Sequence, residues 1–258
     1  MVVRPLRKTV TIFGCGPAGL LCAHAAEQAG MRPMIYSRRQ KSIIPGSQYL
    51  HGPIREVTAV YPEGTVQYVR LGTAEGYAEK VYGDKERYTG WHNYLQIVPS
   101  WNVLKMYDLL WDRYCDQIHE ADITPEFIRS LDAVCYPTFS TIPQSNICIN
   151  GHKFDGAPYY IKTLDTPEID AHHDIVIYNG LTSDLWYRWS ILGGRCSIEA
   201  TRDIWMNDPT VTSGLKATDN NCDCWPEIHR IGRWAEWRHG VLLHSAYERA
   251  CQLMKGIR

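Results

Sequence analysis

The alternation of apolar and polar positions predicts a mixture of strands and helices along this chain. Residues 9–13, TVTIF, form a short β-branched and aromatic run, and residues 20–30, LLCAHAAEQAG, are rich in Ala and Leu and end in Gly30. This pattern predicts a strand followed by a helix that a glycine closes. Residues 31–37, MRPMIYS, predict a second strand, so the chain opens with a β-α-β unit.

Further along the chain, alternating segments and amphipathic runs predict more strands and two more helices. The apolar positions of residues 101–120 recur near helical spacing after Ser100, a residue type that favours helix N-caps, and residues 240–257 form a second amphipathic run rich in Ala and Leu. Strands are predicted for segments 65–71, 78–83, 145–151, 158–164 and 174–180.

Composition and charge are those of an ordinary globular protein. Apolar residues make up 45% of the sequence and charged residues 21%, and 27 Lys and Arg face 28 Asp and Glu. The net charge of -1 gives no overall positive field toward nucleic acid or an anionic membrane. No apolar run approaches the roughly 20 residues of a membrane-spanning helix. Nine scattered cysteines in 258 residues favour reduced thiols, so we expect a cytoplasmic protein.

Three glycines precede the first helix, with the spacing Gly14-x-Gly16-x-x-Gly19. Between a strand and a helix, the first glycine permits the turn, the second lets the backbone approach a pyrophosphate, and the third lets the helix pack on the strand. The phosphates would lie at the helix N-terminus, where N–H groups and the helix dipole favour negative charge. The sequence therefore predicts a Rossmann-like nucleotide-binding unit.

The end of the second strand leaves the identity of the nucleotide open. This position usually carries an acid that accepts hydrogen bonds from the adenosine ribose. Here Ser37 takes its place, followed by Arg38 and Arg39. Two arginines beside a hydroxyl would select the 2'-phosphate of NADP. Alternatively, Ser37 accepts from an ordinary ribose while the arginines stack on adenine or face solvent, which allows FAD.

The residues inside the glycine turn carry a resemblance to a known group of proteins. Pro17 and Ala18 lie between the second and third glycines, and GCGPAGL is similar to the FAD-binding motif of flavoprotein oxidoreductases. Residues 174–199 resemble the UDP-galactopyranose mutase pattern, in which a strand ends in Tyr-Thr-Gly before an Asp and an aromatic residue. The matching residues are Tyr178, Gly180, Asp184 and Trp186, with Asn179 in place of the Thr.

A third segment extends the resemblance toward the C-terminal end. Flavoproteins of the amine oxidase and UDP-galactopyranose mutase-like group have a Gly-Arg or Gly-Asp pair near the start of the last helix, and Gly232 and Arg233 occupy that place. A helix N-terminus presents N–H groups, and an Arg can pair with pyrophosphate in a bidentate manner. The resemblance implies that the N-terminal unit and the C-terminal helix bind FAD together, with Gly46, Ser47 and Gln48 along the cofactor.

Together, the elements and the resemblance predict an α/β protein with a Rossmann-like FAD-binding domain and an inserted α+β domain that binds substrate. The FAD-binding domain is expected to comprise residues 1–50 and 171–258, and the insertion residues 51–170. The chain has a single glycine fingerprint, so we expect no separate NADPH domain.

Several side chains are candidates for chemistry near the cofactor. His51 and His239 are candidate catalytic proton-transfer groups, because histidine titrates near neutrality. Cys222, Cys224 and His229 offer soft ligands, but structural zinc generally uses C-x-x-C spacing with a matching second pair, so we expect no metal. Aromatic rings with polar atoms suit a planar, polar substrate. The expected substrate-binding residues are Trp91, Tyr94, Trp186 and Arg195.

These expectations converge on an FAD-dependent oxidoreductase that oxidises a C–N bond of an amine, or a C–O bond, in a small or nucleotide-linked substrate. The compact chain also resembles phage-encoded flavoproteins that rework amino-acid-modified thymine bases in DNA, although the neutral charge argues against DNA unless the insertion has a basic face. Two other functions stay open. One is a non-redox flavin-dependent mutase with Arg195 and Arg202 at a nucleotide sugar, and the other is an NADP-binding reductase or sensor.

Overall fold

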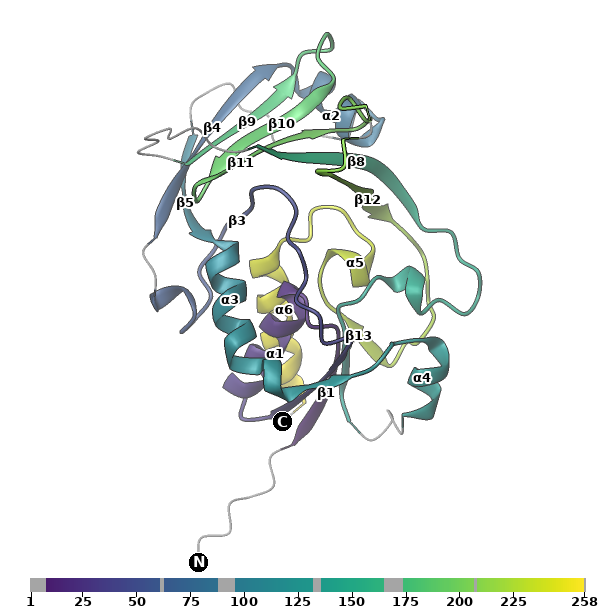
Figure 1. The fold of residues 1–258 in the computed structure, drawn as a ribbon. Coiled ribbons are helices and arrows are strands. Elements are labelled where there is room, and N and C mark those ends of the chain that lie inside the picture. The colour runs from purple at the N-terminus through teal and green to yellow at the C-terminus, as the bar shows by residue number, and fades with distance from the viewer. Residues whose placement is uncertain are drawn as a thin grey trace, which may run out of the picture. The chain divides into compact units, whose positions relative to one another are not determined.

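The chain folds into two compact units (Figure 1). The computed structural model describes residues 8–60, 63–87, 96–131, 136–164, 174–206 and 208–257. Each unit is built from segments that are far apart in the sequence. Unit 1 consists of Met1–Ile43, Lys105–Phe154 and Asp219–Arg258, and unit 2 consists of Ile44–Leu104 and Asp155–Thr218.

Unit 1 is built on a five-stranded parallel sheet with the order β13-β7-β1-β2-β6. Val10, Ile12 and Phe13 of the central strand have no exposed surface, as expected where both faces of a parallel sheet are covered. The strands are β1 (Thr9–Phe13), β2 (Arg32–Ser37), β6 (Ile118–Glu120), β7 (Thr138–Ser140) and β13 (Ile228–Arg230).

The strand order of this sheet reverses at β1. The chain runs from β1 through the helix α1 (Pro17–Gln28) to β2, which pairs with one side of β1, whereas β7 pairs with the other side. In open parallel sheets, ligands bind outside the carboxyl ends of the strands at such a reversal. Gly14 directly follows β1 and therefore begins the segment best placed to bind a ligand in unit 1.

The helices of unit 1 pack around this sheet. α1 and α6 (Leu243–Gly256) lie side by side, and the Tyr247 hydroxyl donates a 2.6 Å hydrogen bond to Gln28 Oε1 between them (Figure 1). Across the described residues, every helix is too short or too polar to traverse a lipid bilayer. The other helices are α3 (Val103–Tyr114), α4 (Pro125–Ser130) and α5 (Arg233–Glu236).

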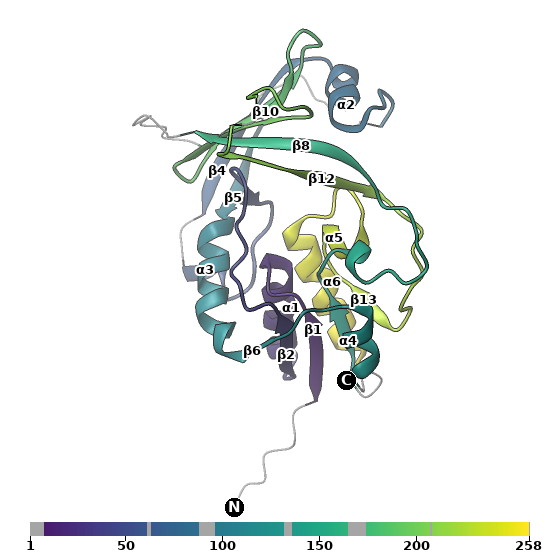
Figure 2. The ribbon, with the colours of Figure 1, turned by 45° about the vertical axis from the view of Figure 1, so that its right-hand side comes forward.

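Unit 2 contains an eight-stranded sheet with the order β12-β8-β11-β10-β9-β4-β5-β3. β4 and β9 are parallel, and Figure 2 shows the long neighbouring strands β8 and β12. The helix α2 (Ala74–Tyr82) packs against β9 and β10. The strands are β3 (Tyr49–Leu50), β4 (Gly64–Gly72), β5 (Gln96–Asn102), β8 (Asp155–Leu164), β9 (Asp174–Gly180), β10 (Trp186–Leu192), β11 (Arg195–Ala200) and β12 (Val211–Asp219).

The two units divide the chain differently from the expected domains. Residues 105–154, expected in the insertion, belong to unit 1 because β6 and β7 pair with β2 and β1. Residues 174–218, expected in the nucleotide-binding domain, belong to unit 2 because β9 pairs with β4 and carries β10 and β11 with it. The boundaries follow strand pairing, which local patterns do not specify.

Three predicted elements also differ from the structure. Residues 78–83 lie in α2 and its C-cap, because Thr73 accepts a hydrogen bond from Gly76 N and Gly83 ends the helix in the left-handed region. Residues 145–151 form a 3-10 turn and bends in place of a strand. Ser100 lies in β5, and α3 begins two residues after Trp101, where Asn102 Oδ1 accepts from Leu104 N at 2.8 Å.

We predict that Gly19→Ala lowers the free energy of unfolding. A Cβ at position 19 would lie 2.0 Å from the Gly14 carbonyl oxygen, so the backbone would have to shift. Overpacking of this kind costs about 1–3 kcal/mol, whereas Gly→Ala inside a helix otherwise gains up to about 1 kcal/mol.

The measurement is thermal denaturation, with Gly256→Ala in α6 as the matched control, because a Cβ there meets nothing within 4 Å. A Gly19→Ala protein as stable as the control would show that α1 does not approach β1 this closely.

Candidate functional site

The glycine turn between β1 and α1 gives each of its glycines a different environment. Gly14 has φ +100, and a Cβ there would lie 2.6 Å from Thr141 Oγ1. A Cβ on Gly19 would lie 2.0 Å from the Gly14 carbonyl oxygen. A Cβ on Gly16 would meet only Ser42 Oγ, at 3.5 Å. The first and third glycines therefore have structural roles, whereas the backbone at Gly16 stays open to a ligand.

The N-terminus of α1 is suited to an anion. Gly16 is the N-cap residue and supplies no side-chain cap, Pro17 occupies the first turn, and no acidic residue lies in that turn. The first N–H groups of a helix have no partner inside the helix, and the helix dipole adds positive potential there. This end of α1 can therefore donate backbone hydrogen bonds to a phosphate.

Tyr107 of α3 holds the glycine turn from the side. Its buried hydroxyl donates to the Cys15 carbonyl oxygen at 3.0 Å and accepts from Ser42 N at 2.9 Å. Burial raises the pKa of Tyr107, although the hydrogen bond from Ser42 partly offsets this, so the hydroxyl stays neutral. Cys15 Sγ also lies 3.2 Å from Ser37 Oγ, which places the Ser37 hydroxyl beside the turn.

Arg38 and Arg39 point to carboxylates of unit 1. Arg38 donates to Asp122 Oδ1 through Nε at 3.0 Å and Nη2 at 2.8 Å. Arg39, with φ 49, lies 3.8 Å from Asp116. Both arginine side chains are more than half exposed. A 2'-phosphate at Ser37 would have to compete with these carboxylates for the two guanidinium groups.

The C-terminal part of the chain meets the glycine turn at Gly232. This residue has φ +91, and a Cβ on it would lie 3.1 Å from the Ala18 Cβ. It follows β13 and is the N-cap of α5, so Arg233 occupies the first position of that short helix. Ile231 N donates to Ser140 O at 2.9 Å and fixes the approach. The structure therefore brings together two segments that the resemblance assigned to one cofactor.

His239 lies after α5, in an open recess of unit 1. Glu236 in this recess accepts from Arg238 at 3.0 Å and from Arg249 at 2.8 Å, so these two arginines compensate its negative charge. The catalytic role of His239 stays a prediction. The lining residues are Glu236, Arg238, His239, Gly240, Val241, Ser245 and Arg249.

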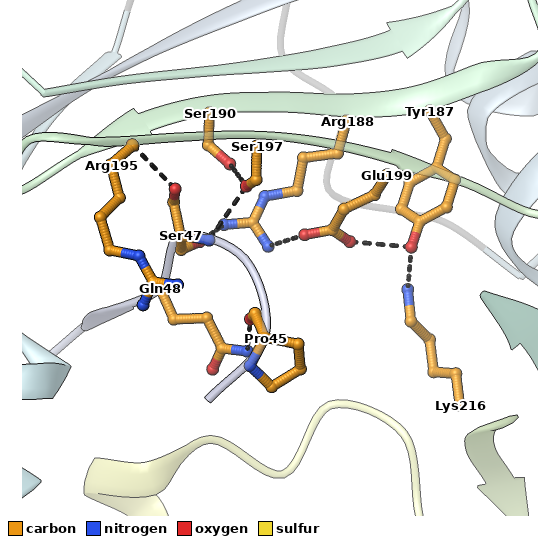
Figure 3. Close-up of polar contacts among 10 residues, drawn as sticks. All are labelled: Pro45, Ser47, Gln48, Tyr187, Arg188, Ser190, Arg195, Ser197, Glu199 and Lys216. Carbon is orange, nitrogen blue, oxygen red and sulfur yellow. Dashed lines mark hydrogen bonds and ion pairs between the residues drawn. The ribbon is translucent and has the colours of Figure 1, made fainter. Parts of the chain in front are cut away.

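In unit 2, the segment of Gly46, Ser47 and Gln48 is anchored to the sheet (Figure 3). Ser47 is buried, its N–H donates to Ser197 Oγ at 2.9 Å, and its hydroxyl donates to Arg195 O at 2.8 Å. Gly46 is buried with φ +67, whereas Gln48 is exposed and donates to Pro45 O. These contacts give Ser47 a structural role in unit 2.

A buried ion pair, missed by the sequence analysis, lies beside this segment. Arg188 donates to Glu199 at 2.9 Å and to Ser47 O at 3.0 Å, and Tyr187 donates to the second Glu199 oxygen at 2.8 Å (Figure 3). Lys216 Nζ lies 3.4 Å from the Tyr187 hydroxyl. Burial would lower the pKa of Arg188, but Glu199 raises it above its usual value. Burial and Glu199 raise the pKa of Tyr187, so it stays a neutral donor.

The remaining predicted substrate and catalytic residues are spread over unit 2. His51 is exposed, with its ring 4.3 Å from the Tyr49 ring. Trp186 is partly buried at the start of β10, and Arg195 Nη1 lies 3.5 Å from Ile44 O. Trp91 and Tyr94 lie outside the described residues. The functions assigned to these residues stay predictions.

The motif that resembles UDP-galactopyranose mutase forms the turn between β9 and β10 in unit 2. Asn179 is buried, and its Nδ2 donates to Asp184 at 2.7 Å and to Trp186 O at 3.3 Å. A Cβ at Gly180 would lie 1.9 Å from Thr73 O, which explains the glycine. The packing of α2 on the sheet therefore accounts for Gly180, and hydrogen bonds within the turn account for Asn179.

Comparison with known proteins identifies the fold. No protein-family model and no curated protein matches the sequence. The structure is similar to the flavin-dependent brominase Bmp2, with a TM-score of 0.57, 9% identity, and coverage of 96% of this chain and 78% of the brominase. It is also similar to CtdE in complex with FAD, with a TM-score of 0.55, 12% identity, and coverage of 96% of this chain and 84% of CtdE. Klebsiella pneumoniae HpxO complexed with FAD and uric acid is similar with a TM-score of 0.50, 10% identity, and coverage of 96% of this chain and 79% of HpxO. The chain has the fold of FAD-containing monooxygenases and halogenases, which confirms the predicted Rossmann-like architecture with a second domain.

We predict that Glu199→Gln loosens the sheet of unit 2. Removing one charge of a buried pair leaves Arg188 uncompensated, and such changes cost about 3–5 kcal/mol. Faster amide exchange is therefore expected in β10 and β11, measured by hydrogen exchange with mass spectrometry. The matched control is Glu63→Gln, which removes an exposed carboxylate of the same unit. Equal exchange in both variants would mean that the Arg188–Glu199 pair does not stabilise the sheet.

Proposed function

We propose that this protein is an FAD-dependent oxidoreductase. The observation that carries the proposal is the pairing of an open Gly16 backbone at the start of α1 with Gly232 packed against Ala18. A pyrophosphate needs the open backbone at Gly16, because it accepts hydrogen bonds from the N–H groups at the start of α1. An extended dinucleotide that both ends of the chain bind needs Gly232 to lie close to Ala18. The likeness in fold to proteins crystallised with FAD supports the same cofactor.

The surroundings of Ser37 favour FAD over NADP. Arg38 and Arg39, which could have selected a 2'-phosphate, lie next to Asp122 and Asp116. An unphosphorylated ribose needs only a hydrogen-bonding group, which Ser37 provides. In this proposal, the first N–H groups of α1 bind the pyrophosphate, Ser37 binds the adenosine ribose, and Arg233 adds positive charge at the start of α5.

The proposed reaction is oxidation of a C–N or C–O bond in a small or nucleotide-linked substrate. FAD, when bound, supplies the hydride acceptor. The chain's residues would bind and orient the substrate, and the proposed substrate-binding residues Trp186 and Arg195 offer an aromatic face and a cation. HpxO binds uric acid, and a planar, polar substrate of that kind fits the same residue types.

A second candidate is a monooxygenase or halogenase reaction. It is favoured by the fold, because the similar structures include a brominase and an FAD-containing monooxygenase. In such a reaction, a nicotinamide reduces the flavin and oxygen reoxidises it, whereas in the first candidate the substrate is the reductant. The two candidates therefore differ in the source of electrons.

The cofactor is tested on purified protein. Denaturation should release a flavin nucleotide, identified as FAD by chromatography and mass spectrometry, and apoprotein should recover flavin absorbance with FAD but not with FMN. Colourless protein that takes up NADPH and no flavin would refute the proposal in favour of the NADP-binding alternative.

The reaction is tested anaerobically on the reconstituted protein. Bleaching of the flavin by amines or alcohols, without nicotinamide, supports oxidation of a C–N or C–O bond. Bleaching by NADPH alone supports the monooxygenase candidate. Turnover of a nucleotide sugar without net flavin reduction would instead indicate a mutase. A thymine base bearing an amino acid belongs in the amine panel, both as a free nucleotide and within DNA.

We predict that Gly16→Ala weakens FAD binding without unfolding the protein. The new methyl group would be in ordinary contact with Ser42 Oγ alone, at 3.5 Å, but would occupy the space that a pyrophosphate needs. A loss of affinity on the order of tenfold is expected, about 1.4 kcal/mol. Fluorescence titration of apoprotein with FAD measures it, with Gly256→Ala as the control. Unchanged affinity would place the pyrophosphate elsewhere.

We also predict that Arg38→Ala combined with Arg39→Ala changes FAD affinity by less than about threefold. Both arginines are exposed and paired, and such surface pairs contribute about 0–1 kcal/mol. The same titration measures this effect. A large loss of affinity in the double variant would show that the guanidinium groups hold the nucleotide directly.

A further inference from the structure

Three thiol sulfurs and one imidazole nitrogen come together from two distant segments of unit 1. Cys148, His152, Cys222 and Cys224 each contribute one atom, and all four atoms lie within 4.8 Å of one another. Cys222 and Cys224 are only 6% and 3% exposed, and Gln144 Nε2 lies 3.3 Å from Cys222 Sγ. The thiols are free cysteines. Buried thiols and an imidazole in such a group form a typical donor set for a soft metal ion.

Three separations within the cluster match a tetrahedral zinc site, and the fourth ligand atom, Cys222 Sγ, lies within 4.8 Å of the other three. Zn–S distances of about 2.3 Å and Zn–N distances of about 2.0–2.1 Å place two sulfurs roughly 3.8 Å apart and a sulfur and a nitrogen roughly 3.5 Å apart. Cys148 Sγ lies 3.9 Å from Cys224 Sγ, and His152 Nδ1 lies 3.4 Å from Cys148 Sγ and 3.7 Å from Cys224 Sγ. We propose that Cys148, His152, Cys222 and Cys224 bind a zinc ion.

The imidazole of His152 is oriented as a zinc ligand would be. Its Nδ1 faces the sulfurs, while its Nε2 lies 3.6 Å from Asp223 Oδ1 on the opposite edge of the ring. When Nδ1 binds the metal, Nε2 carries the proton and directs it toward a carboxylate, the arrangement that fixes the tautomer of metal-bound histidines. Asp223 therefore has the position of an outer partner, between the two cysteine ligands.

The backbone around the ligands is fixed from both segments. Arg230 donates to the carbonyl oxygens of Cys222 and Cys224, the latter at 2.7 Å. Trp225 Nε1 donates to Ile147 O at 2.8 Å, which ties the residue after one ligand to the residue before another. Three thiolates around Zn²⁺ leave one excess negative charge, and the Arg230 guanidinium compensates it nearby.

Four protein ligands leave no open coordination position, so the zinc is structural and does not take part in the reaction. The sequence analysis expected no metal because it considered only the segment of Cys222 and Cys224 and the nearest histidine. His229 lies on β13 with its ring 5.1 Å from the Phe139 ring, whereas the fourth ligand, His152, comes from the segment of Cys148. The local spacings, C-x3-H and C-x-C, are individually unremarkable, and only the fold joins them.

The zinc site is tested by metal analysis of the full chain, purified under reducing conditions from zinc-supplemented cells. Mass spectrometry of the metal should find about one zinc ion per chain. Cys222→Ser and His152→Gln should lose most of it, whereas Cys115→Ser, which changes a free cysteine of unit 1 outside the cluster, should retain it. Chelation should lower the melting temperature of the unmodified protein by roughly 5 °C or more.

A second measurement avoids variants that fail to fold. Co²⁺ added to chelated protein should give the intense visible bands of tetrahedral cobalt and the ultraviolet charge-transfer band of thiolate ligands. Either a weak octahedral Co²⁺ spectrum or zinc-free protein from the supplemented, reduced preparation would overturn the proposal, as would a Cys148–Cys224 disulfide in that preparation. None of these readouts involves a flavin, so the result is independent of the proposed function.

Discussion

The close approach of α1 to β1 is the constraint on which the rest of unit 1 depends. A Cβ on residue 19 would lie only 2.0 Å from the Gly14 carbonyl oxygen, so only glycine permits this packing. The approach places the first N–H groups of α1 above the carboxyl end of the central strand. Thr141, which follows β7, donates to Phe13 O at 2.9 Å and closes the turn from the other side. The N-terminal end of α1 is therefore fixed by its close packing on β1 and by the hydrogen bond from Thr141.

Local signals were sufficient for the β-α-β unit and insufficient for α2. The first strand, turn and helix each have their own sequence signal, and the three signals agree. Residues 78–83 fit an alternating pattern, but the residue that begins the helix lies five positions before that window. Thr73 caps the helix at one end, and Gly83 ends it at the other. Burial of Tyr77, Ala78 and Val81 follows helical spacing, so a longer window with its caps would have predicted the helix.

The division into units and the roles of the charged residues required long-range information. β7 has three residues, too few for a recognisable pattern, yet it pairs with β1 across more than 120 positions. The two open interpretations of Arg38 could not be separated because its partner, Asp122, comes 84 residues later. Similarly, Arg188 and Glu199 look like surface charges until β10 and β11 pair and place them directly opposite each other. In each case local patterns identify a residue or strand but not the distant residue or strand with which it pairs.

The position of the cysteine and histidine cluster connects it with the glycine turn of unit 1. Cys148 and His152 follow β7, and Cys222 and Cys224 precede β13, so the cluster closes a loop that contains the whole second segment of unit 2. A cross-link across a long loop removes more unfolded-state entropy than one across a short loop. β13 is a three-residue edge strand, and Gly232 follows it closely. A zinc ion would thus hold the edge strand, and with it the contact of Gly232 with Ala18, whatever the chain does between residues 155 and 218.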